Sequence, residues 1–302
     1  MKVLGNIIRR NLKLFFKDKG MFFPALITPM ILLVLYATFL AKVYRDSFAS
    51  ALPEGVSIAE KLLNGTVASQ LISALLAVSC VTISFCANLL MIQDKANGSI
   101  RDFMVSPVRR SMLASGYYIA SAASTLIITF SALAISLAYL ATQGWYMTAT
   151  DVLFVILDVF LLTLFGTALS SCVNFFLKTN GQASAIGTMI SAGYGFICGA
   201  YMPISNFGEG LQRVLSFLPG TYGTCLLKNH MMRGVFAEME NIGFPPEVMT
   251  GIKDSVDYNM YFFGKAVPVP VMFAVLIGSI LFFTGLFVLF HVLRSRANAN
   301  RS

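Results

Sequence analysis

The sequence predicts an all-α integral membrane protein with six transmembrane helices, and two observations support that prediction. First, the 302 residues are 57% hydrophobic and only 12% charged, whereas soluble domains carry about 25% charged residues. Second, six stretches reach the roughly 20 apolar residues that a spanning helix needs. They are residues 22–41, 67–92, 117–142, 152–177, 183–202 and 267–293. We therefore expect one transmembrane domain over residues 1–302 and no separate catalytic domain.

The first twenty residues have two distinct faces if they form a helix. Arg9, Arg10, Lys13 and Lys17 fall on one side, and the apolar residues cover the other. A basic amphipathic helix of this kind is typical of a segment that lies on the anionic inner leaflet. The sequence therefore predicts an interfacial helix over residues 1–20, with a basic flank that only fixes topology as the alternative.

The distribution of Lys and Arg predicts the orientation in the membrane. Of the 22 basic residues, 14 lie in the two termini and in the loops after the second and fourth spans. Because basic loops stay in the cytoplasm, both termini should be cytoplasmic in a multi-pass protein of the cell membrane. The net charge of +8 then indicates contact with inner-leaflet lipid. Nucleic acid is not an expected partner, because no basic, aromatic-rich soluble domain is present.

The loop over residues 97–111, between the second and third spans, reads NGSIRDFMVSPVRRS. In a helix, Ile100, Phe103 and Met104 recur at the spacing of one face, while Arg101 and Asp102 lie elsewhere. The segment is too short and too charged to cross a bilayer. It is either an ordinary cytoplasmic turn or a surface that receives a partner.

The fourth span contains a carboxylate, Asp158, with Asn174 further along the same helical stripe of small and polar residues. An ionisable residue inside a membrane is a functional-site hypothesis by default. The alternative is that Asp158 reaches water or a backbone partner near the outer end of its span. No His or second carboxylate is evident at its depth, so a membrane-embedded enzyme is not expected. The cysteine and histidine spacing predicts no metal site.

Small residues recur every fourth position in the fifth span, starting at Ala183 and continuing with Gly187, Ser191, Gly195 and Gly199. Such a ridge lets two membrane helices approach closely. We expect a packing face there, either within one chain or between two.

The loop over residues 203–266 is too long for a simple connection and should face outward. Its weakly apolar pieces, 211–218 and 221–232, are shorter than a span, so we expect re-entrant or interfacial helices. They would cap the outside of the bundle, or form a folded loop with no transport role.

Two segments resemble the hallmarks of the type-2 ABC exporter permeases, which pair with a separate ATP-binding subunit. In DKANGSIRDFMVSPVRRSMLASG, the positions of the family's Gly, Pro and basic residues are filled by Gly98, Pro107, Arg109 and Arg110. The stretch MPISNFGEGLQRVLSFLPGTYGTCLLKNHMMRG is similar to the family's pattern before the last span. The family's glutamate before the glycine is absent, which leaves Asp94 as the nearest acid.

The resemblance implies that residues 97–111 form a coupling helix seated in a groove of the ATP-binding subunit. It also implies a second permease copy and an external gate that includes Pro203, Pro219 and Tyr222. The substrate would be hydrophobic or amphipathic, such as a drug, an antimicrobial peptide or a lipid, and it would move outward. No Walker-type GxxxxGK[ST] sequence is present, so ATP and Mg would belong to the partner and this chain would hold no cofactor.

Two alternatives remain open from the sequence. One is a permease for a lipid-linked polysaccharide or a teichoic-acid-like polymer, to which the single Trp145 lends little support. The other is an ATP-independent channel or membrane scaffold. Disruption of Phe103 or Arg101 would leave the function of a channel or scaffold intact.

Overall fold

The computed structural model describes residues 2–50, 58–100, 103, 108 and 110–299 of the chain. Apart from one short hairpin, the elements of this described part are helices. In chain order they are α1 (Lys2–Lys17), α2 (Lys19–Leu35), the π-helix η1 (Tyr36–Leu40), α3 (Ala41–Ser50), α4 (Glu60–Ala87), α5 (Leu89–Ala96), α7 (Arg110–Gln143), α8 (Ala149–Phe176), α9 (Asn180–Ile197), the 3-10 turn η2 (Ile204–Asn206), α10 (Glu209–Leu215), α11 (Pro219–Asn241), α12 (Pro246–Ser255), the hairpin strands β1 (Tyr261–Phe262) and β2 (Lys265–Ala266), and α13 (Val269–Ala299).

Five helical runs in the described part are long and apolar enough to cross a membrane. They are Lys19–Asp46, Glu60–Ala96, Ser111–Gln143, Ala149–Phe176 and Val269–Leu293. These runs coincide with five of the six predicted spans, so the structure is that of an all-α membrane protein. The first run is continuous through the π-helix η1.

The predicted span over residues 183–202 is wrong in its limits. The helix there, α9, begins at Asn180 and ends at Ile197, and it is not among the five candidate spans. Gly199 ends it, because its φ of +73° allows the amide of Ala200 to donate back to the Gly195 carbonyl at 2.8 Å. Asn180 and Gln182, together with frequent Gly and Ser, lower the mean hydropathy of α9. Six spans therefore remain a prediction.

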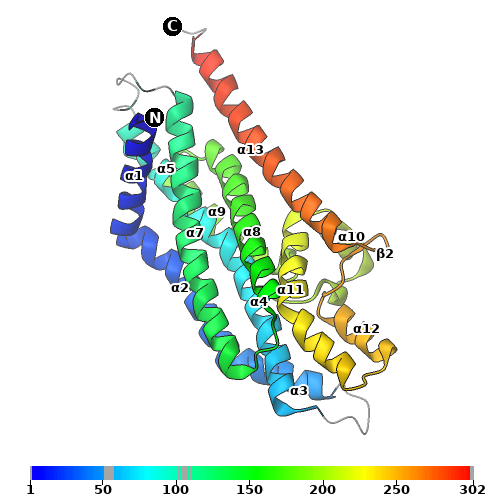
Figure 1. Cartoon of the computed structure of the whole chain (residues 1–302). Coiled ribbons are helices and arrows are strands. Elements are labelled where there is room, and N and C mark those ends of the chain that lie inside the picture. Colours follow the sequence, from blue (N-terminus) through cyan, green and yellow to red (C-terminus); the bar gives the residue numbers. More distant parts are fainter. Residues whose placement is uncertain (1, 51–57, 101–102, 104–107, 109, 300–302) are drawn as a thin grey trace.

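The long helices run side by side, and both ends of the chain lie at the same end of the bundle (Figure 1). We call this the termini end, and we call the opposite end, where α3 lies, the far end. The helix α5 and the start of α7 are at the termini end, whereas α12 is toward the far end (Figure 1).

The helix α4 is the centre of the bundle, with nearly all of its residues buried. It packs against α2, α7, α8, α9 and α11. Its many Ala, Ser and Thr side chains are small, which lets neighbouring backbones come close. Gly166 of α8 shows this most clearly, since a β-carbon there would lie 2.9 Å from the carbonyl oxygen of Cys80. In contrast, α2 and α13 expose most of their apolar residues, as lipid-facing helices do.

The loop predicted over residues 203–266 folds into a compact layer. The predicted piece 211–218 corresponds to α10, but the piece 221–232 is too short, because α11 continues to Asn241. Pro219 occupies its first turn, where a missing amide proton costs nothing. One side of the second half of α11 is buried and packs with α12 through Phe236, Met239 and Met249. This apolar cap explains why α11 extends beyond the length that sequence predicts.

Candidate functional site

The predicted coupling helix lies mostly outside the described residues. Arg101, Asp102, Met104, Pro107 and Arg109 are not described, nor is the side chain of Arg110, which begins α7.

The described part of that loop begins with Gly98, whose φ of +80° turns the chain away from α5. Ile100, just beyond, is half-buried. The ring of Phe103 lies under the guanidinium of Arg10, 5.1 Å from its centroid, in a cation–π contact. This contact joins the loop directly to α1.

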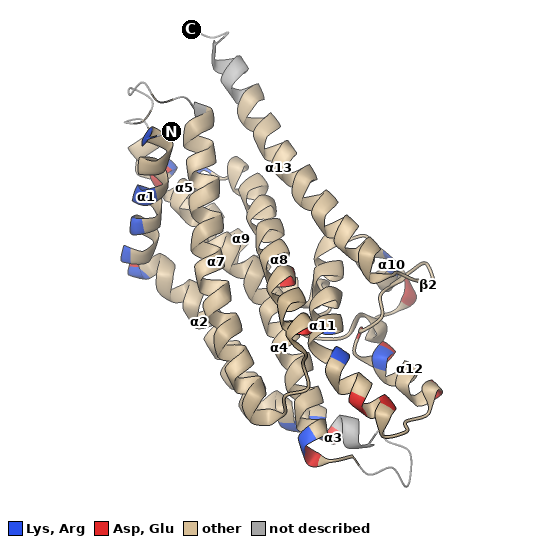
Figure 2. Ribbon diagram, in the orientation of Figure 1, with Lys and Arg blue, Asp and Glu red and all other residues tan. Residues whose placement is uncertain are grey.

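The helix α1 is amphipathic, as predicted. Ile7 and Phe15 are buried on one side, while Arg9, Lys13 and Lys17 are exposed on the other. Lys and Arg positions, drawn in blue, recur along the ribbon of α1 (Figure 2).

Arg10 does not belong to the free basic face of α1. Its guanidinium donates to both oxygens of Asp94 in α5, at 2.6 and 3.2 Å. The hydroxyl of Tyr117 in α7 donates to the same carboxylate, whose side chain is only 8% exposed. The bond to Asp94 raises the pKa of Arg10 above its ordinary value. One buried carboxylate therefore ties α1, α5 and α7 together beside the start of the loop.

Asp158 is fully buried, and the expectation that it lacks a partner at its depth is wrong. Its Oδ2 lies 2.6 Å from Nδ1 of His230 in α11, and the two side chains are 1% and 4% exposed. The imidazole stacks on Phe154 at 4.8 Å between ring centroids and contacts Phe273 of α13. His230 lies on α11, within the piece 221–232 that the sequence indicated, and the packing of this helix against α8 brings the imidazole to the depth of Asp158.

A second acid–base pair lies two turns away along α8. The Nε of Arg233 is 2.6 Å from Oδ1 of Asp151, whose side chain is 1% exposed. Asp151 also caps the start of α8 by accepting from the backbone and hydroxyl of Thr148. Asp151 and Asp158 on α8 thus face Arg233 and His230 on α11, and the two side-chain pairs hold these helices in one register.

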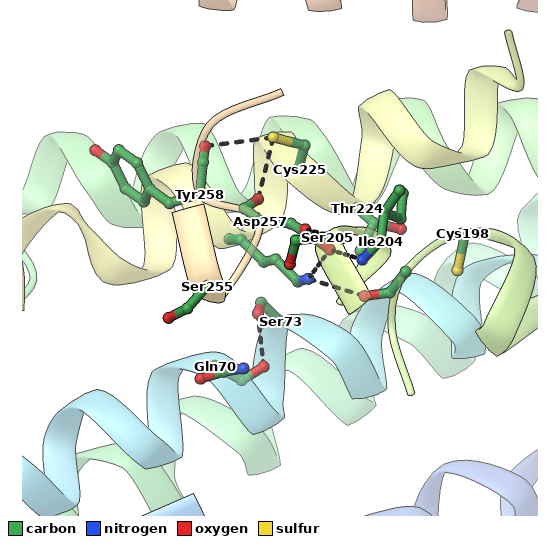
Figure 3. A network of polar contacts seen from close by, with 12 residues as sticks. Gln70, Ser73, Cys198, Ile204, Ser205, Thr224, Cys225, Ser255, Asp257 and Tyr258 are labelled. Carbon is green, nitrogen blue, oxygen red and sulfur yellow. Dashed lines mark hydrogen bonds and ion pairs between the residues drawn. The ribbon is translucent and has the colours of Figure 1, made fainter. Parts of the chain in front are cut away.

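A third charged group ties α11 to the turn after α9 (Figure 3). The ammonium of Lys228, 1% exposed, donates to the Gly199 carbonyl at 2.8 Å. It also lies 3.3 Å from Oδ2 of Asp257, and that oxygen accepts from the amide of Ile204 at 2.7 Å. These contacts border a small cavity of about 100 Å³. Lys228 therefore connects α11, the α9 turn and the loop before β1.

The predicted gate residues lie in the turns around α10, next to the contacts of Lys228. Pro203 precedes η2 and is buried, and Pro219 starts α11. The hydroxyl of Tyr222, a buried residue, donates to the carbonyl of Ser216 at 2.7 Å. All three residues shape the turns that lead into and out of α10.

The stripe predicted on α8 is buried but does not form one site. Asn174 lies 16 residues from Asp158, about 24 Å along a helix. Between them, Asn88, which lies between α4 and α5, donates to the hydroxyls of Ser170 and Ser171. This part of the stripe forms hydrogen bonds between α4 and α8, so it serves helix packing.

The small residues that recur along α9 have different surroundings. A β-carbon on Gly187 would meet open space, whereas one on Gly195 would clash with the ring of Tyr201. Ser191 is half-buried, and Gly199 forms the turn described above. Ala183, the first residue of the ridge, is buried, so the open space lies at Gly187.

No metal site emerges in the described part of the chain, where no group of three or more His, Cys, Asp or Glu side chains is placed to hold an ion. The five cysteines are all free thiols.

Comparison with known proteins identifies the family. No curated protein matches the chain. A family model described as ABC-2 type transporter matches residues 3–231, which include α1, the loop between α5 and α7, and the first half of α11. The match covers about three quarters of the sequence, and the chain therefore belongs to the ABC-2 type transporter family, the membrane-spanning permeases of ABC transporters.

Proposed function

We propose that this chain is the permease subunit of an ATP-driven exporter, with both termini in the cytoplasm. It would move a hydrophobic or amphipathic substrate outward across the cell membrane. The observation that carries the proposal is the junction at Asp94, where α1, α5 and α7 meet beside the loop over residues 97–111. A loop that starts from a braced junction can transmit the movement of an ATP-binding subunit into the bundle.

The loop would dock on that subunit as a coupling helix. Phe103 already contacts α1 through Arg10, so force on the loop would reach α1 as well as the spans on either side. ATP and Mg would be bound by the partner, because this chain carries no Walker-type sequence.

A second copy of the permease, or a close relative, would complete the transport path. The helix α9 packs on α4 and α5, and its other side exposes Met189 and Phe196 at 69% and 50%. Gly187 lies on this helix with open space where a side chain would be, so another helix would have room to approach. The region of Pro203, Pro219 and Tyr222 would form the external gate, held by Lys228.

The experiment is a mild-detergent purification of the tagged chain from its native cells, with ATPase activity measured on the eluate. Phe103→Ala should release a co-purifying ATP-binding protein and its activity, while the permease stays monodisperse. Phe39→Ala is the matched control, because Phe39 is 65% exposed on η1, in a run that is far from the loop. If Phe103→Ala and wild type retain the same partner and activity, the coupling role is wrong.

A further inference from the structure

A cleft of about 330 Å³ opens on the surface between the first and third candidate spans. One wall is built from η1 and α3, the other from α7, and the floor is α4. Lys42, Arg45 and Gln143 line it together with Ala37, Val67 and Ala68. This cleft is separate from the junction at Asp94 and from the contacts of α11.

The cleft is polar toward the far end and apolar toward the middle of the bundle. On α4, Asn64 lies one turn nearer the far end than Val67 and Ala68. On the opposite wall, Lys42 and Arg45 lie beyond Ala37 in the same direction. The polarity therefore changes along the direction of the membrane normal, as it does along a lipid molecule.

Aromatic and charged residues place the polar half at the level of the lipid head groups. Trp145 follows the end of α7 and is 43% exposed, and its indole donates to the carbonyl of Met147 at 2.8 Å. Tyr139 lines the cleft one turn before Gln143. Trp and Tyr concentrate at the boundary between the acyl chains and water, so the cations of the cleft lie at that boundary.

The π-helix η1 shapes the wall that carries these cations. The amide of Ala41 donates to the carbonyl of Tyr36, five residues earlier, and Tyr36 itself is buried. A π-turn adds one residue to a helical turn and often marks a functional site. Here it lies where the apolar half of the cleft meets the basic half.

The charges favour a phosphate as the occupant. The described lining residues include Lys42 and Arg45 but no Asp or Glu. Arg45 meets Glu60 through one nitrogen at 2.6 Å, and a guanidinium has five N–H donors in all. The remaining donors suit the oxygens of a phosphate, which Arg binds in a planar fork.

We propose that this cleft binds a glycerophospholipid of the leaflet at the far end. Its phosphate would lie between Lys42 and Arg45, and an acyl chain would run along Ala37, Val67 and Ala68. The proposal rests on the proposed function only in naming this leaflet the outer one. A lipid held here would contact the first, second and third spans of one chain together.

The test is native mass spectrometry of the full chain, purified in mild detergent and supplied with palmitoyl-oleoyl phosphatidylglycerol. Lys42→Gln/Arg45→Gln should lower the fraction of protein that retains one lipid by about tenfold. A hydrogen bond to a charged group contributes at least the roughly 1.4 kcal/mol that a tenfold change represents. The control Lys61→Gln/Lys265→Gln removes the same charge from two exposed positions outside the cleft and should retain lipid like wild type.

Two further probes separate the possible ligands. Palmitoyl-oleoyl glycerol, which has the same chains without phosphate, should not be retained, and millimolar inorganic phosphate should not displace the phospholipid. Equal retention by the two double variants would overturn the proposal, as would equal binding of the phosphate-free lipid or displacement by free phosphate. Lipid mass on the purified chain does not depend on ATPase coupling, so failure here and failure of the proposed function are distinguishable.

Discussion

Replacing Asp158 by Leu removes the partner of His230 from a site where the two side chains are 1% and 4% exposed. Removing one partner of a buried hydrogen bond costs about 1–3 kcal/mol, because the other polar group stays buried without its partner. Hydrogen bonds between membrane helices contribute only about 0.6 kcal/mol on average. The larger figure should apply here, since apolar rings flank the imidazole on α8 and α13. We therefore expect Asp158→Leu to lower the free energy of unfolding by about 3 kcal/mol.

The double variant Asp158→Leu/His230→Phe gives the sharper test. Phe can keep the stacking that His230 makes with Phe154 and Phe273, and no polar group is then left unpaired. Apolar replacement of both members of a buried pair is often nearly neutral. The double variant should therefore be more stable than the sum of the two single losses predicts, by at least about 1.5 kcal/mol.

The assay is the free energy of unfolding of the detergent-purified chain, from titration with SDS followed by circular dichroism. Ser131→Ala is the control, because this exposed hydroxyl donates to the carbonyl of Ile127 in its own helix; its effect should stay within about 0.5 kcal/mol. If the single losses add up to the loss in the double variant, Asp158 and His230 are not coupled, and the register argued for α8 and α11 is refuted.

Three other predictions follow from single contacts. Asp94→Asn weakens the two bonds from Arg10, so amide hydrogen exchange in α1 should speed up by about tenfold or more, and unchanged exchange would contradict the bracing role. Gly166→Ala forces a β-carbon to 2.9 Å from a carbonyl oxygen of α4 and should destabilise by roughly 1–3 kcal/mol, whereas Gly278→Ala, with open space around it, should not. Burial raises the pKa of Tyr258 above its ordinary 10.0. Its neutral form is therefore favoured in the folded state, and stability should fall as the pH rises beyond about 10. Tyr258→Phe should reduce that fall in an alkaline unfolding series, and an identical pH profile would count against it.

Much of the architecture follows from the sequence because a bilayer imposes simple rules. Long apolar runs must become helices, since no other open backbone satisfies its hydrogen bonds in lipid. Five predicted spans therefore match candidate spans of the structure. The amphipathic N-terminal helix was equally predictable, because its two faces are separated at helical spacing. The end of α9 is a case where a signal was present but was not used, since Gly199 allows the turn that ends the helix.

The partners of the buried charges depended on the tertiary structure. Arg10 and Asp94 are 84 residues apart, and Asp158 and His230 are 72 apart. A pattern did exist, with two acids seven residues apart on one face of α8 and two basic residues three apart on α11. Yet hydropathy gives neither the relative depth of two helices nor their rotation, so the pattern did not identify the pairs.

Sequence alone thus determined that this is a helical membrane protein with a basic amphipathic helix at its start and a compact region before its last span. The tertiary structure decided that this region extends a long helix against α4 and α8, which converts Asp158 from an isolated carboxylate into half of a buried pair. The physical reason is that hydrophobic burial depends on composition and periodicity along the chain. The pairing of charges depends instead on distances of a few ångströms between helices, which only packing sets.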